Sequence, residues 1–167
     1  MEKEKIQERI TRTLGKVESV LDVGCGSCDL VRFLAENIAQ EAVGIDIRSG
    51  GFHGKVRFDK DGTDHSADCI KGDAHSMDSF SDEQFDAVVT VHALHELSNP
   101  EIALSEMRRV LKPEGILFIA DFTKGETRWH EEYYTPEQVK AMLEERGFRQ
   151  IEIERAEVPF LFAVGKK

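Results

Sequence analysis

The sequence has no long apolar run and little cysteine, proline or tryptophan. Its 167 residues include three cysteines, four prolines and one tryptophan. No window approaches the roughly 18 apolar residues of a membrane span, and the N-terminal segment mixes charges where a signal peptide is apolar. Three cysteines cannot all pair, and a reducing cytosol keeps thiols free. We therefore expect a cytoplasmic protein without a membrane segment and with its cysteines as thiols.

Basic residues are outnumbered by acidic ones. The chain has 22 Lys and Arg against 32 Asp and Glu, which gives a formal charge of -10. A field of that sign repels phosphate backbones and anionic membranes. The densest basic cluster, Arg108, Arg109 and Lys112, falls on a predicted outer helix, where a solvated face is the usual role. Nucleic acid is therefore a disfavoured partner.

The apolar residues that are present form alternating strand and helix patterns. The length fits one domain over residues 1–167, with an amphipathic helix at about 2–14 in which Ile6, Ile10 and Leu14 share a face. Strands are predicted at 19–23, 42–47, 69–70, 85–91, 115–121, 151–156 and 160–164. Helices are predicted at 30–38, at 100–111 after a cap at Asn99, and from Pro136 to Gly147 after a capping box at Thr135.

Strands that alternate with helices indicate an α/β fold with a mostly parallel sheet covered on both faces. The last two strands are joined too closely for a crossover, so they should pair antiparallel at one edge. The polar segment 49–68 lacks a helical pattern. Its part around 53–61, before an Asp61-Gly62 turn, fits a small hairpin or an ordered loop.

The carboxyl ends of the predicted strands carry glycines and carboxylates. Gly24 and Gly26 let a backbone approach a ligand closely. Asp29 stands where a dinucleotide fingerprint needs a third glycine, and a carboxylate at a helix start opposes a pyrophosphate. Asp46 is placed to accept hydrogen bonds from ribose hydroxyls, and Asp73 from an adenine amine. Because strand ends meet at one edge, these groups favour a cationic adenosine derivative without phosphates.

At this point the sequence resembles the class I S-adenosylmethionine-dependent methyltransferases, and within them the small-molecule branch similar to ubiquinone and menaquinone methylating enzymes. The resemblance covers about residues 17–167. It rests on VLDVGCGSCDL, AVGIDI, KGDAHSM, FDAVVTVHALHEL, RRVLKPEGILFIADF and YTPEQVKAMLEERGF. It implies a Rossmann-like, seven-stranded sheet of order 3-2-1-4-5-7-6 with strand 7 antiparallel. The usual helix after strand 2 is then replaced by a loop or hairpin.

The resemblance also implies a cofactor, S-adenosyl-L-methionine, and a product, S-adenosyl-L-homocysteine. Carried over by position, the methionine part of the cofactor would lie against the glycine loop. The ribose would lie against Asp46, and the adenine amine would meet Asp73. The implied cofactor-binding residues are Asp22, Gly24, Cys25, Gly26, Asp46, Ile47, Asp73, Ala74 and His92. Cys28 stands where the family commonly has a third glycine, which is tolerable if that position is already helical.

Methyl transfer from a sulfonium is a direct displacement, so a base is needed only if the acceptor must lose a proton. His95 and His92 are the candidate bases, and the alternative is that they line the pocket. The candidate acceptor-pocket residues are Asp121, Trp129, His130 and Tyr133. Alternatively, Trp129 and Tyr133 pack against the N-terminal helix.

The spacing of Cys25 and Cys28 is also that of a metal or redox pair, but no second pair follows, so no metal is expected. The expected function is methyl transfer to a small-molecule acceptor. Rival functions are a non-catalytic S-adenosylmethionine-binding regulatory or scaffold protein, a methyltransferase acting on nucleic acid or protein, and a nicotinamide dehydrogenase. A homodimer is a further hypothesis, in which a partner subunit compensates for the missing helix.

Overall fold

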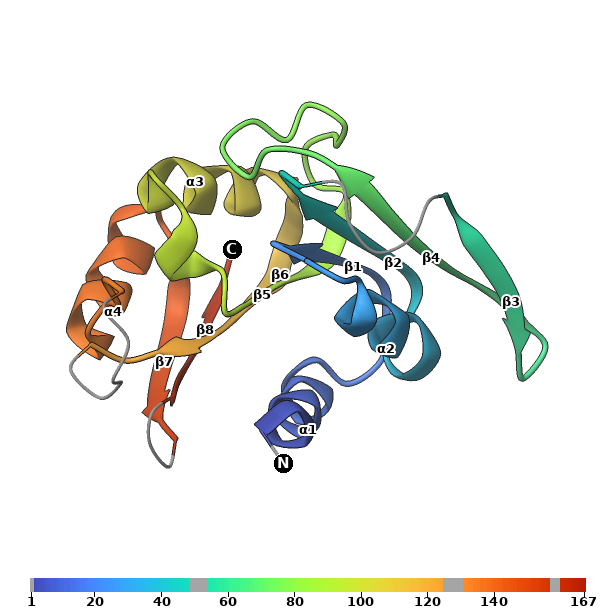
Figure 1. Ribbon diagram of the computed structural model, residues 1–167, viewed down its shortest axis with the longest axis horizontal. Coiled ribbons are helices and arrows are strands. Elements are labelled where there is room, and N and C mark those ends of the chain that lie inside the picture. Colours follow the sequence, from blue (N-terminus) through green and yellow to red (C-terminus); the bar gives the residue numbers. More distant parts are fainter. Residues whose placement is uncertain (1, 49–53, 125–130, 157–159) are drawn as a thin grey trace.

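The computed structural model describes residues 2–48, 54–124, 131–156 and 160–167, and places one eight-stranded sheet between two layers of helices (Figure 1). The elements are, in chain order, α1 (Glu2–Leu14), β1 (Val17–Val23), α2 (Asp29–Asn37), β2 (Ala39–Asp46), β3 (Val56–Lys60), β4 (Thr63–Lys71), β5 (Phe85–Val91), the 3-10 helix η1 (Leu94–Glu96), α3 (Pro100–Val110), β6 (Leu111–Phe122), α4 (Pro136–Glu145), β7 (Arg149–Arg155) and β8 (Phe160–Lys166). None of the described helices is both long and apolar enough to cross a lipid bilayer.

The sheet confirms the predicted arrangement and adds one strand to it. Its order is β3-β4-β2-β1-β5-β6-β8-β7, and β8 runs antiparallel to both neighbours. Without β3, this is the predicted order 3-2-1-4-5-7-6. The predicted count of seven is wrong, because residues 56–60 pair antiparallel with β4 and form a new edge. Alternating Val56 and Phe58 before an Asp61-Gly62 turn gives this hairpin its sequence.

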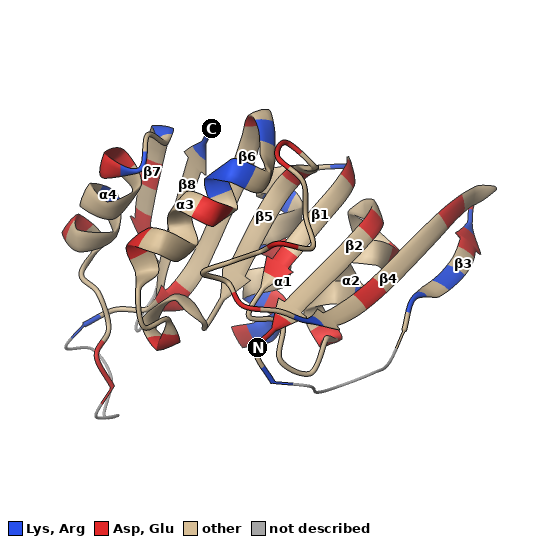
Figure 2. Cartoon of the chain, turned by 90° about the horizontal axis from the view of Figure 1, so that it is seen from above, with Lys and Arg blue, Asp and Glu red and all other residues tan. Residues whose placement is uncertain are grey.

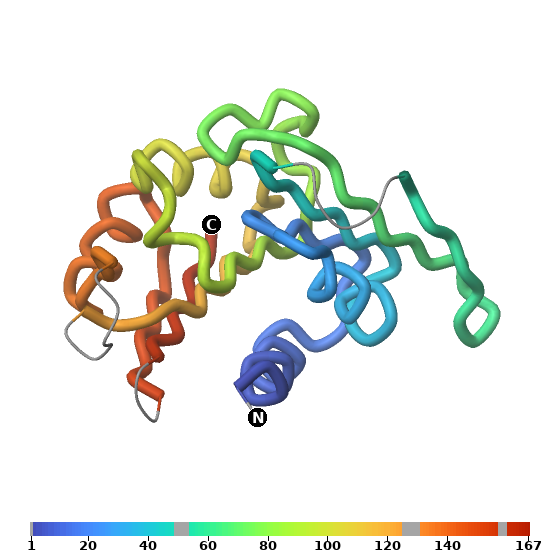
Figure 3. The backbone as a smooth tube through the Cα atoms, in the orientation of Figure 1, coloured from blue at the N-terminus to red at the C-terminus, as the bar shows by residue number. Residues whose placement is uncertain are grey.

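The hairpin β3–β4 follows β2, where the resembled family usually has a helix. It is fixed to α2, because Nδ1 of His65 lies 2.8 Å from the carbonyl oxygen of Ala35, and the Lys60 ammonium donates to the carbonyl of Glu36. The predicted replacement of the helix by a loop or hairpin is therefore confirmed, in the form of a hairpin. Figure 3 shows a second connection without a helix: the chain between β4 and β5 passes over the sheet as a loop.

Each face of the sheet packs against two helices. On one face, α1 and α2 cover Val20, Val89 and Phe118, and the predicted stripe of α1 is buried there. On the other face, α3 and α4 cover Leu21, Val88 and Leu117. The predicted caps are present: the Asn99 side chain accepts from the amide of Ile102, and Thr135 forms a capping box with Gln138.

The basic cluster is less free than the sequence suggested. Figure 2 shows Lys and Arg interspersed with Asp and Glu along the elements in that view. The Arg109 guanidinium donates to Glu106 and Asp82 and to the carbonyl oxygens of Met77 and Phe80. Arg109 therefore ties α3 to the loop between β4 and β5, which leads to one wall of the site described below.

We expect Arg109→Met to lower the free energy of unfolding by about 2–4 kcal/mol, because two carbonyls and two carboxylates lose a charged donor. Lys140→Met is the matched control, since the exposed Lys140–Glu144 ion pair spans 3.8 Å on α4 and is worth well under about 1 kcal/mol. Urea denaturation of both variants measures the difference. Equal losses would show that Arg109 is only a surface charge.

Candidate active site

The glycine loop after β1 is held against the end of β2. The amides of Gly24 and Cys25 both donate to the carbonyl oxygen of Ile45, at 2.8 and 3.0 Å, and the Gly26 amide donates to Asp46 at 3.0 Å. Gly24 has a φ of +82°, and a Cβ there would lie 2.5 Å from the Cβ of Ala93. Only glycine fits this position, as close backbone approach requires.

Two cavities of about 290 and 300 Å³ adjoin at Gly24, which lines both. The first cavity is lined by residues of α1, the loop and the end of β5, among them Glu2, Lys3, Ile6, Asp22, Cys25 and His92. The second is lined by Asp46, Ile47, Arg48, Asp73, Ala74 and Glu96, among others. Together they reach the size of a small-molecule site, roughly 300–1,000 Å³.

The three predicted carboxylates lie on this double cavity. Asp46 and Asp73 line the second cavity, and Asp22 lines the first on the other side of Gly24. Asp22 is buried, and burial together with the charge of Asp46 raises its pKa to about 7. Asp46 accepts from the amides of Gly26 and Arg48.

Asp73 is more exposed than the other two carboxylates. It accepts from the backbone amide of His75 at 2.8 Å and lies 2.7 Å from Nδ1 of the same histidine, and these bonds lower the pKa of Asp73. Ile47 is 66% exposed beside it, where an apolar side chain is free to cover a ring. The cavity therefore combines acidic and apolar groups, as an adenosine moiety needs.

Several lining residues were not singled out from the sequence, among them Arg48, Glu96 and Glu2. Arg48 follows β2 and contacts Asp46, while Glu96 belongs to η1. Glu2 lies at the start of α1, and its carboxylate is 2.9 Å from Nε2 of His92. No local pattern marks these positions, because their placement depends on how distant segments pack.

His95 lies between two carboxylates. Its Nδ1 is 2.7 Å from Asp121, its Nε2 is 3.0 Å from Glu131, and its amide donates to Asp121. Burial lowers the pKa of His95, but the hydrogen bond to Asp121 and the charges of Asp121, Glu131 and Glu96 outweigh it, so the pKa is raised. The predicted residues His95 and Asp121 are thus brought together, and an unforeseen third residue, Glu131, joins them.

His92 occupies the wall of the first cavity. It has a φ of +53°, which is uncommon outside glycine, and its ring stacks on Phe122 at 4.7 Å. Nδ1 of His92 is buried without a hydrogen-bond partner among the described residues. Strained residues with an unsatisfied polar atom concentrate at functional sites. These two features mark His92 as a candidate functional residue of this cavity.

The predicted acceptor residues are only partly described. Tyr133 is buried; its ring lies 4.7 Å from that of His95 and 5.4 Å from that of Phe122, and its hydroxyl donates to Glu131. Trp129 and His130 lie outside the described residues. His95, Asp121, Phe122 and Tyr133 thus form a polar and aromatic cluster where β5 and β6 end.

The cysteines differ from expectation. Cys28 and Cys69 form a disulfide, so the prediction of three free thiols is wrong; only Cys25 is free. Cys28 is the N-cap of α2 with a φ of +67°, a left-handed and not a helical conformation. The sequence could not indicate the pair, because the fold alone brings together residues 41 positions apart. Burial, with the charges of Asp22 and Asp46, raises the pKa of the Cys25 thiol to about 12.

Comparison with known proteins decides the family. The family model described as "Methyltransferase domain" matches residues 21–119, which include the glycine loop, Asp46, Asp73 and His95. The chain belongs to this methyltransferase family. The sheet order and the helices on both faces agree with the class I, Rossmann-like fold of S-adenosylmethionine-dependent members.

Several curated relatives of this methyltransferase-family chain carry the names of quinone or hydroquinone methyltransferases, while others are named as an arginine hydroxylase and a polyketide synthase. The chain is 32% identical over 127 residues to the demethylmenaquinone methyltransferase of Thermotoga maritima, covering 74% of this chain and 53% of the relative. It is 34% identical over 116 residues to the 2-methyl-6-phytyl-1,4-hydroquinone methyltransferase of Synechocystis, covering 70% of this chain and 36% of the relative. The chain therefore spans between about a third and about half of these relatives.

Solved structures agree in fold. A putative methyltransferase from Bacillus halodurans superposes with a TM-score of 0.75 at 18% identity, covering 98% of this chain and 99% of the other. The [4+2]-cyclase SpnF superposes with a TM-score of 0.78 at 18% identity, covering 98% and 80%. Because a cyclase shares the architecture, fold alone does not fix the reaction.

Proposed function

We propose that the chain binds S-adenosylmethionine in the double cavity and transfers its methyl group to a small-molecule acceptor. The observation that carries this proposal is the pair of cavities joined at Gly24, with Asp22 on one side and Asp46 and Asp73 on the other. Carboxylates attract a cation and accept from ribose hydroxyls and an adenine amine. Family membership supports the same ligand.

The residues of the chain have distinct proposed roles. Asp46 accepts from the ribose while it holds the loop through Gly26, and Asp73 with Ala74 and Ile47 encloses the adenine. Asp22, Cys25 and His92 surround the methionine end. When bound, S-adenosylmethionine supplies a methyl group on a positively charged sulfur, which an aligned acceptor displaces directly.

We propose that the acceptor enters beside His95, Tyr133 and Asp121. An acceptor oxygen takes the place of Glu131 at Nε2 of His95, and the neutral imidazole then accepts its proton. Aromatic walls and a proton acceptor suit a phenol or hydroquinone, and the quinone-methylating relatives support this acceptor class. We therefore propose an enzyme that methylates a small molecule. We also predict that the protein forms a homodimer and that it is cytoplasmic.

Incubation with methyl-labelled cofactor tests the proposal. The acceptors offered are a chemically reduced demethylmenaquinone and a small-metabolite extract. We expect label in a low-mass product and formation of S-adenosylhomocysteine. Cofactor binding without label in any product would favour the regulatory or scaffold alternative, and label in RNA or protein would contradict a small acceptor.

Binding of the cofactor is expected to release protons near neutral pH. With a pKa of about 7, Asp22 is about half protonated there. A bound cation favours the ionised carboxylate, lowers this pKa and expels up to about half a proton per site at neutral pH. The release should increase as the pH falls below neutral, be largest midway between the pKa values of the free and bound states, and fade at pH values well above the free pKa and well below the bound one.

Calorimetry in two buffers with different ionisation heats measures this release. Other ionisable side chains that line the first cavity are those of Glu2, Lys3, Cys25, Asp29 and His92. The Asp22→Asn variant is therefore the control, because it removes the titrating group and keeps the others. A wild-type protein that releases no more protons than this variant would show that Asp22 does not face the cation.

A further inference from the structure

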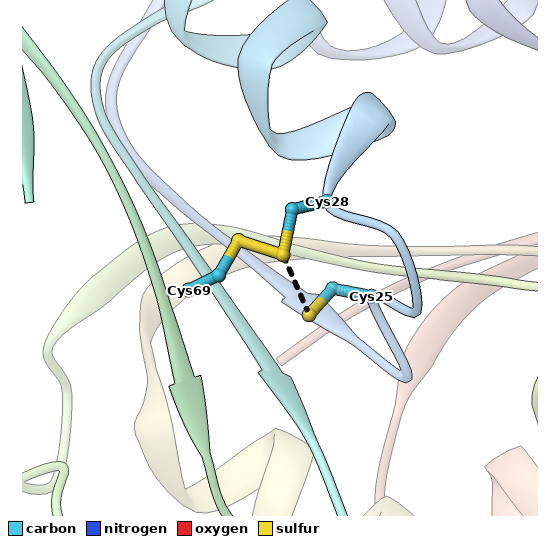
Figure 4. A group of neighbouring side chains, drawn as sticks. All are labelled: Cys25, Cys28 and Cys69. Carbon is cyan, nitrogen blue, oxygen red and sulfur yellow. Dashed lines mark hydrogen bonds between the residues drawn. A yellow bond between two sulfur atoms is a disulfide. The ribbon is translucent and has the colours of Figure 1, made fainter. Parts of the chain in front are cut away.

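All three cysteines of the chain meet beneath the glycine loop (Figure 4). Cys25 comes from the loop, Cys28 from the start of α2 and Cys69 from β4. Their sulfur atoms lie within 4.8 Å of one another, and Sγ of Cys25 is 3.6 Å from Sγ of Cys28. Cys25 and Cys28 are buried, and Cys69 packs against the same apolar cluster.

The neighbouring backbone accommodates these sulfurs at a cost. Gly44 lies directly beside Cys69 in the sheet, and a Cβ at Gly44 would lie 2.8 Å from Sγ of Cys25. Cys28 holds a left-handed conformation, with a φ of +67°, that is strained for a residue other than glycine. A glycine at 28 would avoid that strain, whereas cysteine places a sulfur beside those of Cys25 and Cys69.

We propose that the reduced cysteines form a site for one thiophilic cation, Zn²⁺ or Cu⁺. Thiolate ligands select these ions, and three protein ligands leave one position open. Sulfurs around a tetrahedral Zn²⁺ at about 2.3 Å are about 3.8 Å apart, close to the spacing of Cys25 and Cys28. The carboxylates of Asp22 and Asp46, which disfavour a bare thiolate nearby, favour a bound cation.

The Cys28–Cys69 disulfide must be reduced before the metal can bind, and a phosphine supplies the electrons. The phosphine and one water reduce the Cys28–Cys69 disulfide to two thiols, and the phosphine becomes its oxide. The cation then displaces the protons of three thiols. The oxidised form offers only Cys25, so the disulfide excludes the metal. This site lies under the loop and does not depend on the proposed methyl transfer.

The test titrates phosphine-reduced protein with Zn²⁺, and separately with Cu⁺, against a chromophoric chelator. We expect about one equivalent of one of these ions per chain, and at least about 100-fold weaker binding to the disulfide form. Co²⁺ as a probe should give thiolate charge-transfer absorption. Reduced wild-type protein that binds neither ion would overturn the site and leave only a disulfide.

Cysteine variants distinguish the loss of metal binding from a loss of folding. Cys28→Gly suits the left-handed backbone, so it should keep the far-ultraviolet circular dichroism of the wild type and lose metal binding by about 100-fold. Cys25→Ser and Cys69→Ser should lose it as well. His75→Ala, which removes a half-buried histidine outside the cysteine cluster, should bind as the wild type does. A folded Cys28→Gly protein with wild-type metal affinity would refute the proposal.

Discussion

His95→Gln is expected to lower the methyl-transfer rate about 100-fold while leaving the affinity for S-adenosylmethionine within about twofold, because general-base catalysis contributes at least that much to rate. The structural basis is the pair of contacts that hold the ring, from Asp121 to Nδ1 and from Glu131 to Nε2. Glutamine keeps polarity at this position but cannot accept a proton near neutral pH.

The pH profile distinguishes a base from a wall residue. Because the pKa of His95 is raised above its usual value, the neutral, proton-accepting ring forms only at higher pH. The wild-type rate should therefore rise with pH through that pKa, and the His95→Gln rate should lose this rise. Asp121→Asn should lower the rate about tenfold and move the rise to lower pH, since the ring loses its anionic partner. A glutamine variant with the wild-type rate and profile would show that His95 only lines the pocket.

Asp46→Ala should weaken S-adenosylmethionine binding by roughly 5- to 150-fold, or about 1–3 kcal/mol. The carboxylate is lost as a ribose acceptor, and the Gly26 amide loses the bond that fixes the loop. Asp46→Asn keeps an acceptor for that amide, so we expect a smaller loss of cofactor affinity. That loss measures the contribution of the charge alone.

Asp59→Ala is the matched control for Asp46, because it removes an exposed aspartate of β3, outside the two cavities. Its affinity should equal that of the wild type. Calorimetric titration measures all three variants. If Asp46→Ala binds the cofactor as tightly as Asp59→Ala does, the ribose assignment is wrong.

The order of strands and the carboxylates at their ends could be predicted because both depend on local sequence patterns. Apolar runs that end in Asp46 or Asp73 indicate a strand and its position at the carboxyl edge. The extra edge strand was harder, because only Val56 and Phe58 alternate before the turn. A five-residue pattern of that kind does not separate a strand from an ordered loop.

Contacts between distant segments were beyond the sequence. Glu131 reaches His95 from 36 positions along the chain, and Glu2 reaches His92 from α1. Nothing in the local sequence distinguishes Glu131 or Glu2 from an ordinary surface glutamate. The cysteine cluster has the same cause, since the register of β2 with β4 places Cys69 under the loop. Side-chain partners of this type follow from packing and not from spacing.

The most direct test of the central claim is calorimetric titration of the unmodified chain with S-adenosylmethionine, with NAD as the comparison ligand. A phosphate-free cation should bind in about one equivalent per chain, and the pyrophosphate of NAD should be rejected by the acidic cavities. Saturable binding of NAD, or no heat of binding with S-adenosylmethionine, would contradict the account.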